Sequence, residues 1–326
     1  QVFRSQEDQI TKYIHKDGSE TCIKTIPSVD GRLDSKTGIV SELKEDRNKV
    51  SVFLSASKGC PMNCTFCSLT VNAVSFARLD TKQVLENVWA AILKESETVI
   101  LADRYIKICW MGMGEAILNP AMIKTVTLTL MDRIMETGLA KGLDGMDIST
   151  VLPKINSGWI DVLVDLNTRL AAYPRNPAQK NKNRSPLRLF YSLHSAIEET
   201  RNGIIPGALP IAKAIDQMKM ASQAGLDVIV HHMFLDGIND SDTEIAALKT
   251  LMQTELPNSE LRVLRFNAHE RSEIRESVRF DACIAALCGN IDQLKVQSSY
   301  GYDVKSACGQ FIAGDVEALA ERRVAA

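Results

Sequence analysis

The run Cys60-Pro61-Met62-Asn63-Cys64-Thr65-Phe66-Cys67 restricts what this chain can be more than any other stretch. Its C-x3-C-x2-C spacing can bring three thiolates to one face of a tight loop. Three thiolates suit three corners of a [4Fe–4S] cube whose fourth iron has no protein ligand, and an open iron can hold a small molecule by its amino and carboxylate groups. A zinc knuckle or a chance grouping is the alternative. Zinc prefers four protein ligands, but no second cysteine pair is near and the next histidine is His194.

The composition is that of an ordinary soluble globular protein. The chain has 326 residues, of which 45% are hydrophobic and 24% are charged, and its net charge is −2. No apolar run reaches the roughly 18–20 residues of a membrane span, and no signal peptide opens the chain. Beyond the three clustered cysteines, the other five follow no regular disulfide pattern. We therefore expect a cytoplasmic protein with no membrane partner.

Short apolar strands alternate with longer helical patterns along most of the chain, which is typical of parallel βαβ units. We expect residues 1–49 to be an N-terminal extension with one strand near Thr21–Ile26, residues 50–316 to be the main domain, and residues 317–326 to be a tail. The expected strands are Val50–Ser55, Tyr105–Trp110, Met146–Ser149, Leu187–Leu193, Val228–Met233, Leu261–Phe266 and a short Leu294–Ser298. The expected helices are Thr81–Lys94, Pro120–Glu136, Trp159–Leu170, Ile211–Ala224, Asp242–Thr254 and Val278–Cys288. Six such units predict an α/β fold, an open (β/α)6 partial TIM barrel whose ligands gather at the carboxyl ends of the strands.

Polar residues and glycines stand where these strands end. Met111-Gly112-Met113-Gly114-Glu115 follows the second strand, and its glycines would let the backbone approach a ligand whose ammonium group Glu115 could hold. Other strands end at Ser149, at Ser192-Leu193-His194 and at Asn267. Each could simply cap a strand, but their common position at one rim favours a binding site.

The cysteine spacing resembles the signature of radical S-adenosylmethionine (SAM) enzymes, and other motifs make the resemblance more specific. The chain is similar over about residues 8–316 to the RlmN/Cfr family of radical SAM methyltransferases, which methylate an adenine carbon in RNA. The motifs are Ser57–Cys67, Met111–Glu115, Ile148–Thr150, Tyr191–His194, Met233–Asp240, Phe266-Asn267 and Asp303–Gln310. The last of these, with Ala307-Cys308-Gly309-Gln310, is the most diagnostic.

The resemblance implies both the cofactors and the residues that hold them. Cys60, Cys64 and Cys67 would bind a [4Fe–4S] cluster that receives electrons from a donor such as flavodoxin or ferredoxin. SAM would contact Gly114, Glu115, Ser149, Ser192, Leu193, His194 and Asn267. Cys308 would be the methyl carrier, because an electron-poor sp2 carbon cannot attack the methyl group of SAM directly. One SAM would methylate Cys308, and a second would supply the 5′-deoxyadenosyl radical that activates that methyl group.

Three departures from the family concern the acceptor and the release of product. Phe53 stands seven residues before Cys60, where the family has a second cysteine that releases the product. Cys22 is then the plausible substitute, and the alternatives are release by an outside thiol or a product other than a simple methyl group. The family's N-terminal RNA-binding domain is also absent from this sequence. The third departure is an insertion, residues 173–184, within a stretch from Leu166 to Ile197 that has no acidic residue.

The acceptor is therefore open at the level of sequence. The basic residues Arg175, Lys180, Lys182 and Arg184 of the insertion either contact RNA phosphates or belong to a solvated loop. An adenine in RNA is the favoured acceptor, and a small molecule such as a nucleoside or a natural-product scaffold is the first alternative. A non-catalytic RNA-binding paralogue that retains the cluster is the second. The cluster motif, Met111–Glu115 and Cys308 stand against it, because a binding module would not need all three.

Overall fold

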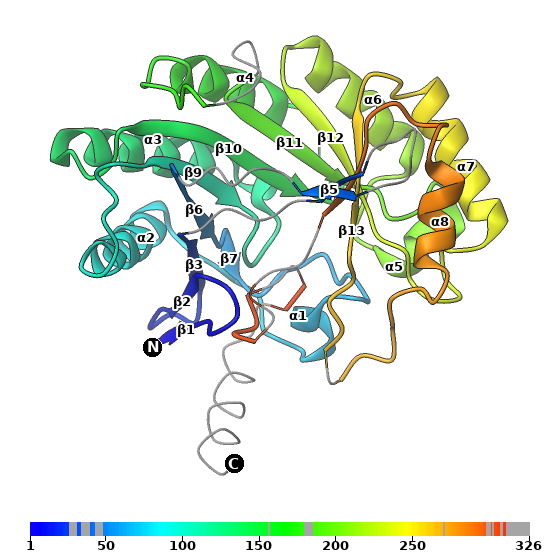
Figure 1. Cartoon of the computed structure of the whole chain (residues 1–326), viewed down its shortest axis with the longest axis horizontal. Coiled ribbons are helices and arrows are strands. Elements are labelled where there is room, and N and C mark those ends of the chain that lie inside the picture. The colour runs from blue at the N-terminus through cyan, green and yellow to red at the C-terminus, as the bar shows by residue number, and fades with distance from the viewer. Residues whose placement is uncertain are drawn as a thin grey trace.

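The structure is a computed structural model, and Figure 1 shows it with its elements labelled. It describes residues 1–25, 31–33, 40–42, 48–155, 157–178, 185–269, 271–297, 301, 303–306 and 309–310. Cys308 and three of the four basic residues of the insertion, Lys180, Lys182 and Arg184, lie outside the described residues. In the described part, no helix is long and apolar enough to cross a membrane.

One ten-stranded sheet forms the centre of the molecule, in the order β1-β2-β3-β6-β9-β10-β11-β12-β13-β14. Neighbouring strands from β6 onward are parallel. They are β6 (Lys49–Leu54), β9 (Tyr105–Trp110), β10 (Gly142–Thr150), β11 (Leu187–Ser192), β12 (Asp227–His232), β13 (Glu260–Leu264) and β14 (Leu294–Gln297). Within the described residues β1 and β14 end the strand order and do not pair, so the sheet is open.

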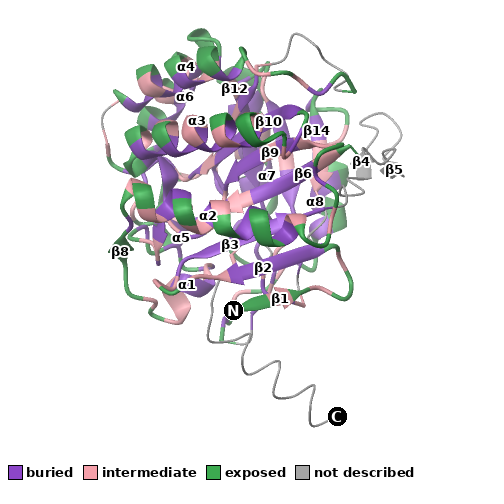
Figure 2. Cartoon of the chain, turned by 90° about the vertical axis from the view of Figure 1, so that its left-hand side faces the viewer, coloured by how far each residue is buried: buried purple, intermediate pink, exposed green. Residues whose placement is uncertain are grey.

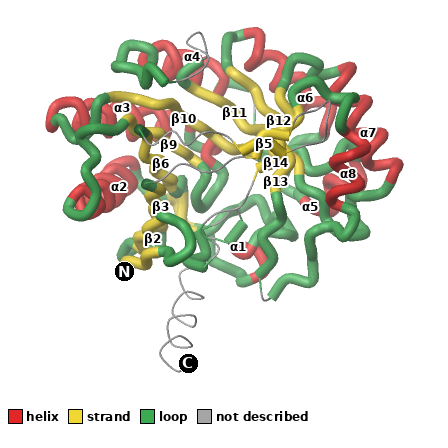
Figure 3. Tube along the Cα trace, viewed as in Figure 1, coloured by secondary structure: helices red, strands yellow, loops and turns green. Residues whose placement is uncertain are grey.

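A helix follows each parallel strand except the last, which confirms the predicted six βα units. These helices are α2 (Thr81–Ser96), α3 (Pro120–Thr137), α4 (Trp159–Leu170), α6 (Ile211–Gln223), α7 (Asp242–Thr254) and α8 (Phe280–Leu287). The shorter elements are α1 (Ser68–Val71), η1 (Ala116–Leu118), α5 (Glu198–Ile204) and the pairs β4 (Gly31–Leu33) with β5 (Val40–Glu42) and β7 (Ser57–Lys58) with β8 (Ala77–Arg78). The long helices lie on the outer side of the strands, and the loops around α1 lie on the inner side (Figure 3).

The N-terminal extension is more ordered than the sequence predicted. β1 (Val2–Arg4), β2 (Ile10–Ile14) and β3 (Glu20–Lys24) form an antiparallel ribbon that continues the sheet beyond β6. A buried ion pair joins two of these strands, with Lys12 Nζ 2.8 Å from a Glu20 carboxylate oxygen. Charged residues are rarely buried unless they are paired, and this pairing across the strands explains how such a polar segment joins the sheet.

The two faces of the sheet differ in chemistry. Apolar side chains between the strands and the outer helices form the main core, and the helices turn their exposed sides to solvent (Figure 2). The inner face carries charges instead: Lys107 and Arg188 each lie 2.6 Å from the Asp147 carboxylate. Burial alone would raise the pKa of Asp147, but Arg188 and Lys107 hold it below its ordinary value. These ion pairs therefore link the neighbouring strands β9, β10 and β11 across this face.

Local sequence fixes both ends of α3, the helix that follows β9. The Asn119 side chain accepts a hydrogen bond from the Met122 N–H at 3.2 Å, and Pro120 occupies the first turn of the helix. The helix ends at Gly138, whose φ of 64° is left-handed and costs glycine little. The segment from Glu115 to Asn119 is therefore fixed between the end of β9 and the start of this helix.

Candidate active site

The cysteine loop lies immediately beyond β7, on the inner side of the sheet. Cys64 is buried, Cys60 and Cys67 are partly buried, and none of the three forms a disulfide. The Cys67 N–H donates to the Cys64 carbonyl at 3.1 Å, which makes the turn tight. Gly59 has a φ of 62°, and a Cβ there would come within 2.7 Å of the Ser75 carbonyl oxygen. Glycine therefore permits the loop to fold back on its own continuation.

The thiols of Cys60, Cys64 and Cys67 fit a cluster in which each thiolate binds a different iron. Within the described residues, no three His, Cys, Asp or Glu side chains converge on the position of one ion. Thiolates that bind different corners of a [4Fe–4S] cube do not need to converge in this way. Burial raises the pKa of the Cys60 thiol to about 12, and the thiols of Cys64 and Cys67 are raised by burial as well. The raised pKa values favour the protonated thiols. A bound metal would instead favour the thiolates, because coordination deprotonates a thiol.

The glycines predicted to approach a ligand also approach the neighbouring strand. The Gly112 N–H donates to the Leu54 carbonyl at 2.9 Å, and a Cβ on Gly112 would lie 2.7 Å from that oxygen. Gly114 has a φ of 93°, and its Cβ would meet Ser57 Oγ at 2.2 Å. Neither position has room for a side chain, so Glu115 is held against the segment that leads into the cysteine loop.

Glu115 is the buried acid of the site. One of its carboxylate oxygens accepts a hydrogen bond from the Val151 N–H at 3.0 Å, and the other has no partner among the described residues. Burial raises the pKa of Glu115 to about 7. A buried carboxylate with one free oxygen suits a ligand that brings a positive charge or an N–H donor.

The ends of β10, β11 and β12 bring the other predicted SAM contacts together. Ser149 Oγ and Ser192 Oγ are 3.4 Å apart across neighbouring strands. The Leu193 N–H donates to the His231 carbonyl at 3.0 Å. His194 follows with a left-handed φ of 57°, and its ring packs edge-on against Phe66 of the cysteine loop at 5.2 Å. Its side chain is buried, which lowers its pKa and keeps the imidazole neutral.

Arg201, which was not predicted from the sequence, connects the segments that follow these strands through hydrogen bonds. Its guanidinium is fully buried and donates to the carbonyls of Leu193, Leu209 and Val151 at 3.0, 2.9 and 2.8 Å. No carboxylate pairs with it among the described residues. Its helix α5 also packs on the cysteine loop, since the Thr65 N–H donates to the Ile204 carbonyl at 3.0 Å. The only signal for it in the sequence was an arginine shortly before the apolar pair Ile204-Ile205, a few residues beyond Ser192-Leu193-His194.

The two residues that follow Cys308 are fixed at the same rim. The Gly309 carbonyl accepts from the Ser68 N–H, next to Cys67, at 2.9 Å. The Gln310 amide donates to the Ala268 carbonyl at 2.9 Å, next to the predicted SAM contact Asn267, which is itself buried. Gly309 and Gln310 are therefore held between the cysteine loop and the residues that follow β13.

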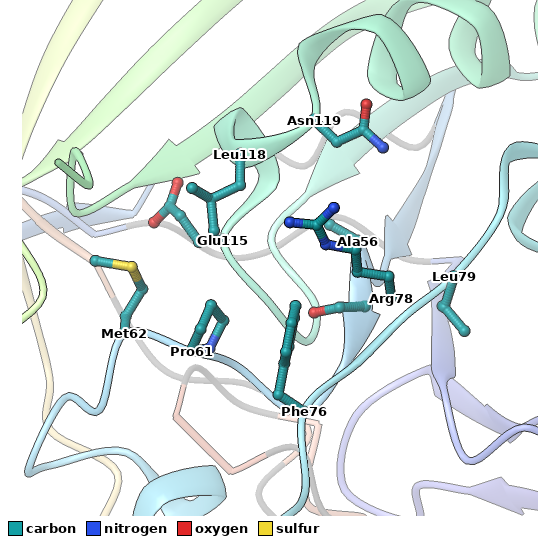
Figure 4. A pocket seen from close by; sticks show the side chains of 10 residues that line it. Ala56, Pro61, Met62, Phe76, Arg78, Leu79, Glu115, Leu118 and Asn119 are labelled. Carbon is teal, nitrogen blue, oxygen red and sulfur yellow. The ribbon is translucent and has the colours of Figure 1, made fainter. Parts of the chain in front are cut away.

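A cavity of about 520 Å3 opens beside this rim. Figure 4 shows Glu115 at one side of it, Met62 and Pro61 of the cysteine loop below, and Arg78 and Phe76 opposite. Phe76 and Arg78 belong to the segment that includes β8, and the sequence analysis assigned them no function. A strand of two residues has too little periodicity to be predicted, and this explains why they were missed.

The predicted RNA contact Arg175 is not brought to this rim. Its backbone forms an isolated β-bridge with Leu143 at the start of β10. Ser149 and the other predicted SAM contacts stand instead at the carboxyl ends of the strands. The insertion connects α4 to β11 and so leaves from the amino-terminal end of the sheet.

Comparison with known proteins agrees with this geometry. Residues 54–248 match the family model described as "Radical SAM superfamily". Two relatives are each named "Probable dual-specificity RNA methyltransferase RlmN". The one from Prochlorococcus marinus (strain NATL2A) is 27% identical over 308 residues, which cover 93% of this chain and 76% of the relative. The one from Chlorobium chlorochromatii (strain CaD3) is 24% identical over 310 residues, with coverages of 89% and 74%.

A solved structure shares the fold. It is the crystal structure of a radical SAM methyltransferase from Sphaerobacter thermophilus, with a TM-score of 0.66 and 22% sequence identity, and the match covers 95% of this chain and 79% of that one. The fold and the cysteine loop thus define a radical SAM enzyme, whose cofactors are a [4Fe–4S] cluster and SAM. The chain belongs to the radical SAM superfamily, and its predicted similarity to RlmN proteins is confirmed.

We predict that Arg201→Gln weakens both folding and SAM binding. The change removes charged hydrogen bonds to three carbonyls, and bonds of that kind contribute about 1.5–3 kcal/mol each, so a loss of roughly 3 kcal/mol or more in the free energy of unfolding is expected. Arg201→Lys should lose less, because it retains the charge and one or two bonds. Urea unfolding and equilibrium dialysis of SAM measure the two effects.

Arg279→Gln is the control, since Arg279 pairs with Asp242 at the surface. If Arg201→Gln unfolds and binds SAM like the wild type, Arg201 does not hold the rim.

Proposed function

We propose that this enzyme methylates an sp2 carbon, with an adenine in RNA as the favoured acceptor, through an S-methylcysteine on Cys308. The observation that carries the proposal is the attachment of the residues beside Cys308 to the cysteine loop, through Gly309 and Ser68. Gly309, the residue after Cys308, is thereby held beside Cys67, one of the cysteines that would bind the cluster. The names of the two RlmN relatives support methyl transfer to RNA.

The residues of this chain have distinct tasks in such a reaction. Cys60, Cys64 and Cys67 would hold the cluster, and Glu115 would accept the ammonium group of SAM. Ser149, Ser192, Leu193, His194 and Asn267 would line the rest of SAM along the strand ends. When bound, the cluster and SAM supply a methyl group and a 5′-deoxyadenosyl radical. The Cys308 thiolate would attack the methyl carbon of SAM, with S-adenosylhomocysteine as the leaving group. Removal of a hydrogen atom from the resulting S-methyl group would leave a carbon radical able to add to the acceptor ring.

Two observations favour the small-molecule alternative for the acceptor. The chain is slightly acidic, with a net charge of −2, and Arg175 lies at the other end of the sheet from the rim. The names of the relatives favour RNA. The proposed external electron donor, flavodoxin or ferredoxin, is the same for both acceptors.

The first experiment concerns Cys308. Reconstituted wild-type protein incubated with SAM should carry one methyl group on Cys308, which peptide mass spectrometry locates. Cys308→Ala should still bind the cluster and SAM but transfer no methyl group to RNA. Cys288→Ala is the control and should behave like the wild type, because Cys288 stands at the end of α8. Undiminished transfer by Cys308→Ala would mean that Cys308 carries no methyl group.

Cys22 is the thiol proposed to release the product from Cys308. It stands directly opposite Phe53 in the antiparallel pair of β3 with β6, so the two side chains share one face of the sheet. The Cys22 thiol donates to Ser306 Oγ at 3.3 Å, two residues before Cys308. Phe53, Cys60 and Cys67 pack in the same apolar cluster as Cys22. The register thus supports Cys22 in the role that the family's second cysteine would have at Phe53.

The chemistry of that release balances with one thiol. Once the ring has lost its proton and an electron to the redox partner, a CH2 bridge joins Cys308 to the acceptor. The Cys22 sulfur attacks the Cys308 sulfur, the S–S bond forms and the S–C bond breaks. The electron pair stays on carbon, which takes up a proton to become the methyl group, and an external dithiol reduces the disulfide.

We predict that Cys22→Ala accumulates a covalent adduct between the protein and the acceptor, visible as a mass increase. Adding Phe53→Cys to that variant should restore turnover, because the new thiol would face the same side from the opposite strand. Cys109→Ala is the control: Cys109 is level with Phe53 on the next strand, β9, but its neighbours are the charges of the inner face. Normal turnover by Cys22→Ala would show that an outside thiol releases the product.

A further inference from the structure

The cavity beside Glu115 has a mouth whose chemistry the proposed function does not use. Phe76 and Leu118 line it with 43% and 42% of their surfaces exposed, so two large apolar side chains face solvent at one place. Arg78 lines the same space and is also exposed. Among the described residues, Arg78 makes neither an ion pair nor a side-chain hydrogen bond. The Arg78 guanidinium and the exposed Phe76 ring therefore stand together at the entrance (Figure 4).

Backbone pairing fixes this pair of side chains relative to the cysteine loop. β8 runs antiparallel to β7, with Arg78 opposite Ser57 and Ala77 opposite Lys58. Phe76 and Arg78 stand on either side of Ala77 in and just before β8, and both line the cavity. Cys60 follows Lys58 after one residue, and Gly59 lies against the carbonyls of Val74 and Ser75. Any ligand held by Phe76 and Arg78 is thus held at a constant offset from the cluster-binding cysteines.

The combination suits a nucleic-acid strand. An exposed aromatic ring can stack on any base, and an unpaired arginine can bind a phosphate through two N–H groups. SAM, by comparison, is expected to lie along the strand ends and to reach only the inner side of this cavity, at Glu115. The mouth faces solvent through exposed residues, so a chain longer than one nucleotide can cross it.

We propose that Phe76 and Arg78 form a subsite for single-stranded RNA next to the reacting nucleotide. A neighbouring base stacks on Phe76, and the phosphate that joins it to the acceptor pairs with Arg78. The subsite deepens the proposed function, on which it rests, because it names the acceptor as a polynucleotide. It also replaces Arg175 by a cation at the correct end of the sheet.

The test measures RNA binding by the reconstituted full chain with SAM present. The probe is a fluorescein-labelled single-stranded RNA of about eight nucleotides, within the usual site sizes, followed by anisotropy at several KCl concentrations. Phe76→Ala should weaken binding about 5- to 150-fold, the range found for loss of one base stack, and Phe76→Trp should bind like the wild type. Arg78→Gln should weaken binding at low salt and reduce the slope of log K against log[KCl] by about 0.7, the value for one phosphate on a single strand.

Two controls separate the subsite from general effects. Leu93→Ala removes an apolar side chain of equal exposure from α2, and Lys213→Gln removes an exposed cation from α6. Neither should change RNA binding. SAM affinity should stay the same in Phe76→Ala and Arg78→Gln.

Three results would overturn the subsite. They are no RNA binding by the wild type, equal binding by wild type, Phe76→Ala and Arg78→Gln, or a loss of SAM affinity in Arg78→Gln, which would assign that arginine to the carboxylate of SAM. Methylation of Cys308, measured by mass spectrometry in the same samples, distinguishes failure of the subsite from failure of the proposed function. A methylated Cys308 without dependence on Phe76 and Arg78 rejects the subsite alone.

Discussion

The buried guanidinium of Arg201 is the interaction on which the candidate site depends. It has no carboxylate partner among the described residues, and its three hydrogen bonds all go to main-chain carbonyls, those of Leu193, Leu209 and Val151. Burying an unpaired charge is costly unless hydrogen bonds and nearby negative charge compensate for it. Here the hydrogen bonds hold the ends of β10 and β11 at a fixed distance. Val151 in turn donates to Glu115, so the acid and the strand ends form one connected network.

The cysteine loop is built onto this network from two sides. Phe66 packs against His194, and Thr65 is bonded to the end of α5. On the other side, Gly112 and Gly114 let the loop after β9 lie directly on the segment that leads to Cys60. The loop is therefore positioned both by backbone contacts and by the ring contact of Phe66 with His194. Such contacts are what an enzyme needs to place a radical source next to a tethered thiol.

Most of the fold and part of the site could be predicted from the sequence. The βα order was readable because each strand is a short apolar run and each long helix has its own periodicity. The ribbon β1–β3 was not, because Lys12 and Glu20 look like surface residues until strand pairing brings them together. Arg175 was grouped with possible RNA contacts from charge alone, which does not tell which end of the sheet a loop leaves. The position of Cys22 opposite Phe53 depends on the register between two strands, and no local pattern encodes that register.

The central claim is that Cys60, Cys64 and Cys67 hold a cluster whose fourth iron is open to SAM. Electron paramagnetic resonance of the anaerobically reconstituted, reduced protein, with and without SAM, tests it most directly. We expect about four irons per chain and a reduced-cluster spectrum that changes when SAM is added. Tightly held zinc with no iron, or a cluster spectrum indifferent to SAM, would contradict it.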